Sequence, residues 1–212
     1  MGAMMANQAN WDQAYNQGEF TRSWYQERPR VSLRMLRLAG AQPTDSVVDV
    51  GGGAAPLVDA LLDQGFTDLA VLDISQTGLH YAQQRLGTLS QRVSWVCADV
   101  LTWRPKRRYR IWHDRAAFHF LTDPDAQLRY LNTLTSVLEP GGRIVIGTFA
   151  ADGPSQCSGL PVSRYAPDSL AERLGTGFTV LASEREKHQT PSGTIQPFTW
   201  LVAQMTRELS GS

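Results

Sequence analysis

Three consecutive glycines follow a short apolar segment in the stretch VVDVGGGAAPLVDALLDQG, which spans residues 47–65. The residues before Gly51 have the composition of a buried strand, and those after Gly53 have apolar side chains at helical spacing. A turn without side chains, placed between a strand and a helix N-terminus, lets a ligand approach the backbone closely. Because glycine-rich turns also serve as plain connectors, the strands that follow must decide between the two interpretations.

Short apolar segments alternate with segments of helical periodicity along the chain, which is typical of a doubly wound α/β sheet. We expect strands at residues 46–51, 69–75, 92–100, 109–114 and 143–149, and helices at 30–40, 55–65, 76–86, 124–142 and 167–175. In the helix 124–142, the side chains expected to face the core are Leu128, Leu131, Leu134 and Leu138. The sequence PSG at 191–193 predicts a hairpin, which makes the last strand pair antiparallel.

Acidic residues stand at or near the ends of three successive predicted strands, namely Asp49, Asp73 and Asp99. Ligands bind at the carboxyl ends of strands in an open parallel sheet, whereas unpaired carboxylates in a core are costly. Asp73 follows the glycines by about 20 residues, the usual position of an acid that binds ribose hydroxyls. Carboxylates suit a cationic ligand and repel a pyrophosphate. The GxGxxG spacing of nicotinamide enzymes is also broken, since Pro56 takes the place of its third glycine.

These residues resemble the motifs of class I S-adenosylmethionine-dependent methyltransferases, and the resemblance covers residues 10–205. VVDVGGGAAPL, VLDIS and VCADV are similar to the first three motifs, IWHDRAAFHFL takes the place of the fourth, and LEPGGRIVIGTF resembles the late helix-to-strand motif. Ala55 replaces the third glycine of the first motif. The resemblance implies an α/β fold with a seven-stranded sheet, six strands parallel and the last antiparallel. It also implies S-adenosyl-L-methionine as cofactor and S-adenosyl-L-homocysteine as product.

The resemblance also implies roles for individual residues. Gly51 and Gly53 would pass under the methionine part of the cofactor, and Asp49 would hold the loop or the cofactor's amine. Asp73 would bind the ribose, and His113 would lie with Asp114 near the transferable methyl group. The implied cofactor-binding residues of the domain are Asp49, Gly51, Gly53, Asp73, Ile74, Asp99, Val100 and Asp114.

The first 29 residues are expected to form an N-terminal helical and aromatic arm on a single domain at 30–212, with residues 1–9 disordered or vector-derived. The aromatic residues of the arm are Trp11, Tyr15, Phe20, Trp24 and Tyr25. They either cover one end of the sheet or form a lid whose ring faces attract a sulfonium cation. The pattern WDxxY followed by WYQ is similar to a methyltransferase branch that includes lysine methyltransferases of translation elongation factor. We expect Trp11, Tyr15 and Trp24 to contact the cofactor and Tyr25 the acceptor.

The segment HDRAAFHFLTD at 113–123 follows the fourth strand and is expected to line the acceptor pocket. His119 is the first candidate for a catalytic base because its unperturbed pKa is near neutrality; a purely structural role is the alternative. Asp114 and His113 are the other catalytic candidates. Arg115 would orient an acceptor carboxylate, or else brace the carboxylate of the cofactor or of Asp114.

Composition narrows the possible partners. Twenty Lys and Arg balance twenty Asp and Glu, so no nucleic-acid partner is expected, and the basic segment at 104–110 is interpreted as a solvated loop. No apolar run approaches the ~18 residues of a membrane span. Cys97 and Cys157 form neither a disulfide framework nor a metal pattern, so we expect no metal and a cytoplasmic domain with reduced thiols.

The sequence therefore predicts an S-adenosylmethionine-dependent methyltransferase that acts on a sulfur, oxygen or nitrogen nucleophile of a small-molecule acceptor. One alternative is a protein lysine N-methyltransferase, which the arm favours and the cation in HDRA disfavours. A second alternative is a non-catalytic protein that binds S-adenosylmethionine. The acceptor atom and the oligomeric state stay open at the level of sequence.

Overall fold

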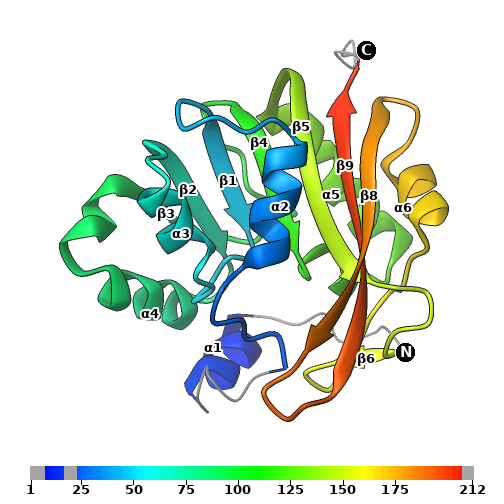
Figure 1. The fold of residues 1–212 in the computed structure, drawn as a ribbon, viewed down its shortest axis with the longest axis horizontal. Helices are drawn as coiled ribbons and strands as arrows, with labels where there is room; N and C mark the ends of the chain where they lie inside the picture. The colour runs from blue at the N-terminus through cyan, green and yellow to red at the C-terminus, as the bar shows by residue number, and fades with distance from the viewer. Residues whose placement is uncertain (1–7, 17–22, 207–212) are drawn as a thin grey trace.

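A computed structural model of the protein describes residues 8–16 and 23–206 (Figure 1). Within this part of the chain, seven strands form one sheet in the order β3-β2-β1-β4-β5-β9-β8. Strands β1 to β5 pair in parallel, and β9 pairs antiparallel with both β5 and β8, so the expected sheet with its antiparallel last strand is confirmed. The strands are β1 (Ser46–Val50), β2 (Asp68–Asp73), β3 (Val93–Cys97), β4 (Tyr109–Arg115), β5 (Leu138–Phe149), β8 (Phe178–Gln189) and β9 (Ile195–Met205).

Helices cover both faces of the sheet and create two separate cores. Val48 and Val50 of β1 enter the core beneath α5 and α6, whereas Val47 enters the core beneath α2 and α3. Strands buried on both faces are apolar at nearly every position, which explains the short apolar runs in the sequence. The helices are α2 (Arg30–Leu38), α3 (Leu57–Asp63), α4 (Gln76–Leu86), α5 (Pro124–Val137) and α6 (Pro167–Leu174). None of the described helices is long and apolar enough to cross a membrane.

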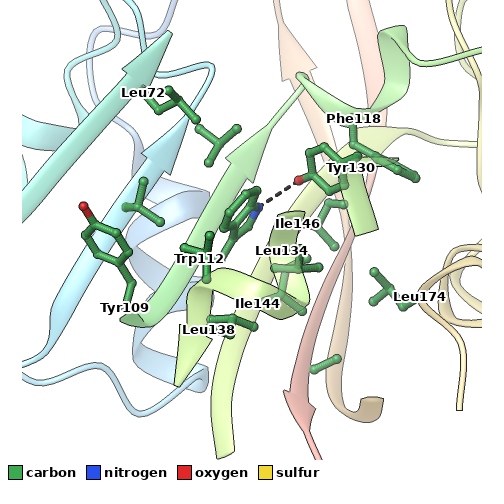
Figure 2. Close-up of a cluster of buried hydrophobic side chains, with 14 of the residues drawn as sticks. Leu72, Tyr109, Trp112, Phe118, Tyr130, Leu134, Leu138, Ile144, Ile146 and Leu174 are labelled. Carbon is green, nitrogen blue, oxygen red and sulfur yellow. Dashed lines mark hydrogen bonds between the residues drawn. The ribbon is translucent and has the colours of Figure 1, made fainter. Parts of the chain in front are cut away.

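The core beneath α5 contains a buried hydrogen-bonded pair, shown in Figure 2. The indole Nε1 of Trp112 donates to the hydroxyl of Tyr130 over 2.8 Å, and the two rings meet edge to face with centroids 5.5 Å apart. The Tyr130 hydroxyl in turn donates to Asp114 over 2.6 Å. This chain of hydrogen bonds ties α5 to the carboxyl end of β4, where the fourth sequence motif lies.

The predicted helix 124–142 is wrong at its C-terminal end. Helix α5 stops at Val137, and the segment Pro140-Gly141-Gly142 lies inside β5. The pairing of β5 with β4 changes register there, and Gly141 has a φ of 70°, so this segment forms an irregular bulge in the strand. The inward prediction for Leu128 is also wrong, since 57% of its surface is exposed. The buried stripe of α5 consists of Ala126, Gln127, Tyr130, Thr133, Leu134 and Val137.

Two further local differences affect the site. Strand β3 ends at Cys97 rather than at residue 100, so Asp99 lies in the loop that follows the strand. A short hairpin, β6 (Gln156–Cys157) with β7 (Leu160–Pro161), was not anticipated and buries Cys157. The predicted β8–β9 hairpin is present, with its turn at residues 190–194.

Helix α1 (Gln8–Asn16) packs against α4 at the end of the sheet where β1 terminates (Figure 1). Gln8 and Ala9 belong to this helix, which contradicts the expected disorder of residues 1–9 at these two positions. Residues 1–7 and Phe20 lie outside the described residues. The division into an arm at 1–29 and a domain at 30–212 stays a prediction.

Candidate functional site

A cavity of about 340 Å³ lies where the parallel strands end. This volume is within the ~300–1,000 Å³ that is usual for small-molecule sites. Its lining residues come from the loops after β1, β2 and β3, from the segment after β4, from β6 and from the arm: Val50, Gly51, Leu72, Asp73, Ile74, Ala98, Asp99, Val100, Leu101, Arg115, Ala116, Ala117, Phe120, Leu121, Cys157, Trp11, Tyr15 and Trp24. A smaller cavity of about 60 Å³ adjoins it near the glycine turn and is lined by Asp49, His113 and Tyr25 among others.

The glycine turn is shaped by close contact with the arm. Gly51 and Gly53 have φ angles of 68° and 42°, a region that residues with a side chain rarely adopt. A side chain at Gly53 would also collide with the hydroxyl of Tyr15. The ring of Tyr15 also packs closely against α4, because a Cβ added at Gly78 of that helix would be 2.6 Å from the ring. Tyr15 lines both cavities and therefore stands between them.

Asp73 lines the main cavity at the end of β2, as predicted. One of its oxygens accepts a hydrogen bond from the backbone N–H of Ser75 over 2.7 Å. Burial raises the pKa of Asp73 to about 7; hydrogen bonds from Ser75 and Gly53 oppose this rise, and the charges of Asp49 and Asp12 add to it. A carboxylate can accept more hydrogen bonds than these two, so Asp73 is suited to accept hydroxyl hydrogen bonds from a ligand.

The other residues predicted for the nucleoside also line the main cavity. Ile74 and Val100 present apolar surface beside Asp73 and Asp99. Asp99 uses one oxygen to accept the backbone N–H of Leu101 over 2.8 Å, which holds its carboxylate in the loop after β3. The structure thus brings together acidic and apolar side chains from two neighbouring strand ends, as the sequence predicted.

Asp49 and His113 face each other across β1 and β4 in the smaller cavity. The carboxylate of Asp49 and Nδ1 of His113 are 2.7 Å apart, and both side chains are buried. Among the described residues, Nε2 of His113 has no hydrogen-bond partner. His113 therefore positions Asp49 beside the glycine turn and does not line the main cavity.

Asp114 does not line either cavity. It is fully buried and accepts hydrogen bonds from Tyr130, Ala117 and Phe118. Burial raises the pKa of Asp114 to about 6, against the effect of these hydrogen bonds. This geometry does not fit the predicted catalytic role, because the contacts of Asp114 hold the backbone turn after β4 and attach α5 to it. That turn includes Ala116, which has a φ of 69° and does line the main cavity.

His119 lies behind the cavity wall. The residue belongs to the short 3-10 helix η3 (Phe118–Phe120), which turns Phe120 toward the cavity and buries the imidazole completely. Nδ1 of His119 accepts the backbone N–H of Phe149 over 3.3 Å, and the ring packs edge to face on Phe120. Burial and the charge of Arg115 lower the pKa of His119 to about 3. A base must reach the proton it removes, so this position does not fit the predicted catalytic role.

The arm covers the cavity through aromatic and polar contacts. Trp11 meets Phe120 edge to face with ring centroids 4.9 Å apart, and it meets Trp24 at 5.9 Å. Asp12 accepts hydrogen bonds from the Ser75 hydroxyl over 2.5 Å and from the Thr77 backbone N–H over 3.0 Å, at the N-terminus of α4. These contacts fit the predicted lid. They also add Asp12, whose signal in the sequence was only its place inside the aromatic pattern WDxxY.

Arg115 and Cys157 also line the main cavity, together with Phe120 and Leu121. Nη1 of Arg115 donates to the backbone carbonyl of Trp24 over 3.0 Å, and no contact joins Arg115 to Asp114 in the described part of the chain. Burial lowers the pKa of Arg115 and raises the pKa of the Cys157 thiol. Sequence reasoning missed Cys157, Phe120 and Leu121 as lining residues, since only the β6–β7 hairpin and η3 bring them there.

The donor set fits the group that the sequence motifs imply. Three carboxylates, an apolar slot and aromatic faces suit a nucleoside that carries a positive charge, whereas a pyrophosphate would be repelled. Residues 47–142 match the methyltransferase-domain family. Over these residues, from β1 to the Pro-Gly-Gly segment of β5, the chain is similar to the methyltransferases of that family.

Comparisons with individual proteins agree with this family. The chain is 28% identical over 158 residues to malonyl-[acyl-carrier protein] O-methyltransferase 1 of Ilyobacter polytropus, a match that covers 69% of this chain and 58% of that protein. Among solved structures it resembles 1,6-didemethyltoxoflavin-N1-methyltransferase of Burkholderia thailandensis, with a TM-score of 0.73, 23% identity, and coverage of 98% and 94% of the two chains. It also resembles the N-methyltransferase NodS of Bradyrhizobium japonicum, with a TM-score of 0.70, 16% identity, and coverage of 93% and 100%. At these identities the structural likeness establishes the fold.

Proposed function

We propose that this protein transfers the methyl group of S-adenosylmethionine to a sulfur, oxygen or nitrogen atom of a small-molecule acceptor. The observation that carries the proposal is one covered cavity, which joins the acids after β2 and β3 to a separate wall formed by Arg115, Phe120, Leu121 and Cys157. A cavity with two chemically different halves can hold two molecules in contact. The relatives named above methylate different atoms, so none of their acceptors is carried over.

Each half has a distinct task. S-adenosylmethionine, when bound, supplies a methyl group activated by a sulfonium. Asp73 and Asp99 would accept hydrogen bonds from the nucleoside, and Asp49, held by His113, would face the methionine end. Trp11 and Trp24 cover the cavity and exclude water, which aligns the two reactants and prevents hydrolysis.

The residues that the structure describes offer no base positioned for the acceptor. Among the described residues, the polar side chains in the wall beside Phe120 are Arg115 and Cys157, and the raised pKa of Cys157 keeps it a neutral thiol near pH 7. We therefore infer that the acceptor arrives as an already competent nucleophile, such as a thiolate or a neutral amine. Rates should then follow the ionisation of the acceptor rather than that of a protein group.

The cation at Arg115 also bears on the rival acceptor class. A protein lysine enzyme needs an acidic channel for an ammonium side chain, and here the buried charge beside Phe120 is positive. A small acceptor is therefore favoured over a protein lysine. The predicted cytoplasmic location stays a prediction; the two cysteines are free thiols in the structure.

Calorimetry and turnover test this proposal together. We expect S-adenosylhomocysteine to bind in the micromolar range, and S-adenosylmethionine to be consumed with at least one member of a panel of small thiols, phenols and amines. Methyl label that appears in lysate protein, with no turnover of small acceptors, would support the lysine enzyme. Cofactor binding without turnover on any acceptor would support a non-catalytic protein, and the absence of cofactor binding would contradict all three hypotheses.

A further inference from the structure

Arg115 lines the main cavity and also the smaller cavity beside the glycine turn. Arg115 is the last residue of β4, and its Cζ is 4.7 Å from the centre of the Phe198 ring. Phe198 belongs to β9, and the sheet order β1-β4-β5-β9 places that strand beyond β5 on the side opposite β1. The guanidinium therefore stacks on a ring of β9, which lies on the side of β4 opposite β1.

The hydrogen bonds of Arg115 are incomplete in a specific way. Nη1 donates to the carbonyl of Trp24 over 3.0 Å. Nε and Nη2 are buried, and within residues 8–16 and 23–206 neither has a partner. The N–H groups of Nε and Nη2 point in the same direction and form the pair that holds a carboxylate by two parallel hydrogen bonds. Buried donors without partners are rare in proteins and costly, which points to a ligand that completes them.

The acid with the largest charge effect on Arg115 does not complete them. Glu186 of β8 is close enough to influence Arg115, but its two oxygens accept hydrogen bonds from Trp200 over 2.7 Å and from Gln26 over 3.1 Å. The charge of Arg115 also lowers the pKa of both His119 and His188. The positive charge of Arg115 is therefore not paired with a carboxylate of the described residues, and a bound anion would complete its hydrogen bonds.

The walls around the guanidinium are otherwise apolar or neutral. Phe120, Leu121 and Trp11 supply apolar surface, and Cys157 supplies a neutral thiol. A ligand that fits here has an apolar body with a single anionic group at one end.

We propose that the acceptor of this protein carries a carboxylate, which Nε and Nη2 of Arg115 bind side-on while its apolar body lies against Trp11 and Phe120. The proposal rests on the proposed methyl transfer and adds the class of acceptor. Because Nε and Nη2 are covered by neighbouring side chains, the carboxylate reaches them after a small rotamer change, which is common when ligands bind.

Matched probe pairs test the proposal on the unchanged protein saturated with S-adenosylhomocysteine. The pairs are benzoate with benzamide, 4-hydroxybenzoate with 4-hydroxybenzamide, and 3-mercaptopropionate with 3-mercaptopropanamide, and calorimetry measures their affinities. We expect each carboxylate to bind about tenfold or more tightly than its amide. Equal affinities, or no binding by any carboxylate, would overturn the proposal.

Two variants and a matched control locate the effect. Arg115→Gln and Arg115→Lys are expected to abolish or reduce the preference for carboxylates while S-adenosylhomocysteine binds as in the unchanged protein. Arg143→Gln is the control, since Arg143 of β5 also has a buried Nε without a partner in the described chain and donates to the Ala39 carbonyl away from the cavity. Its carboxylate preference should persist.

The variants also separate this idea from its rivals. If Arg115→Gln weakens S-adenosylhomocysteine and leaves any carboxylate preference intact, the guanidinium serves the cofactor and the proposal is wrong. If the unchanged protein does not bind S-adenosylhomocysteine at all, the proposed methyl transfer fails first. In that case the preference among the probe pairs, measured without cofactor, still decides whether Arg115 holds a carboxylate.

Discussion

At the scale of single residues, the site combines side chains that are held in costly states. Asp73 is a buried carboxylate near two other acids, and its pKa is raised to about 7. Arg115 is a buried cation, and two of its nitrogen donors, Nε and Nη2, have no hydrogen-bond partner among the described residues. Both conditions are relieved by ligands that supply hydroxyl donors to Asp73 and an anion to Arg115, which matches the chemistry of the proposed occupants.

The raised pKa of Asp73 predicts a pH dependence of cofactor binding. Ribose hydroxyls donate to the ionised carboxylate, so affinity is full above pH 7 and falls as the pH drops below the pKa. Calorimetry of S-adenosylhomocysteine should show roughly tenfold weaker binding at pH 6 than at pH 8. Asp73→Asn should bind about 1–3 kcal/mol more weakly at pH 8 and lose this slope. An unchanged slope in the variant would assign the titration to another group.

The same pKa shift affects stability with a defined sign. The pKa of Asp73 is higher in the folded chain than its ordinary value of 3.8, so the folded chain binds more protons between these pH values. This contribution to stability is fully present below pH 3.8 and is lost as the pH rises through 7. It therefore opposes the pH dependence of cofactor binding.

The buried position of His119 predicts that its substitution affects folding more than turnover. His119→Phe keeps the edge-to-face packing on Phe120 but removes the acceptor for the Phe149 N–H, at a cost of about 1–3 kcal/mol in the free energy of unfolding. We expect kcat to stay within about twofold of the unchanged protein. A loss of about 10²-fold or more in kcat at unchanged melting temperature would support His119 as the catalytic base.

At the scale of elements, the sequence predicted the strands and acids well because each depends on local pattern. Alternation of strand and helix periodicity, the glycine turn and Asp73 after β2 all follow from neighbours in the chain. His119 and Phe120 show the limit, since a single 3-10 turn exchanges which of them faces the cavity. Cys157 shows another, because it reaches the site through contacts between distant segments. The end of α5 was missed because the bulge in β5 depends on pairing with β4.

Helix α1 is stabilised by its contacts rather than by its own sequence. It has nine residues with one buried side chain, Tyr15, and isolated helices shorter than ~12–15 residues are marginal in water. Its charged attachment is Asp12, which accepts the hydroxyl of Ser75 and the N–H of Thr77 at the N-terminus of α4. The lid is therefore fastened to the same turn that orients Asp73.

Removal of this attachment should loosen the lid selectively. Asp12→Ala is expected to weaken docking of α1 by about 0.5–2 kcal/mol, which is the usual value of a capping interaction. Hydrogen exchange should become faster in residues 8–16, and S-adenosylhomocysteine should bind more weakly. Gln13→Ala, an exposed change on the same helix, serves as the control. Unaltered exchange in residues 8–16 of Asp12→Ala would contradict this role.

At the scale of the whole molecule, the sheet separates two cores that share no α-helix. Leu134 of α5 lies in one core and Leu61 of α3 in the other, and both are fully buried. Trp112 and Tyr130 tie the first core to the turn after β4 (Figure 2). Stability is therefore drawn from two sets of contacts, which meet through the strands and through η3, where Phe118 packs in the first core and Phe120 against the second.

Because the cores are separate, the effects of mutations in the two cores on the free energy of unfolding are expected to add. Leu134→Ala and Leu61→Ala should each lower the free energy of unfolding by about 2–5 kcal/mol, measured by urea denaturation. The double variant should equal their sum to within ~0.5 kcal/mol, since the sites share no partners. Leu128→Ala is the exposed comparison and should change stability by no more than about 0.5 kcal/mol. Strong non-additivity would show that the sheet transmits strain between its faces.

The position of β9 between β5 and β8 has a consequence for biosynthesis. Strand β8 leaves the ribosome before β9, yet it has no partner in the sheet until β9 has paired with β5. Phe198, on which Arg115 rests, also arrives with this late strand. While the nascent chain is still being made, the nucleoside side of the sheet can assemble, but the wall around Arg115 forms only after β9 has emerged.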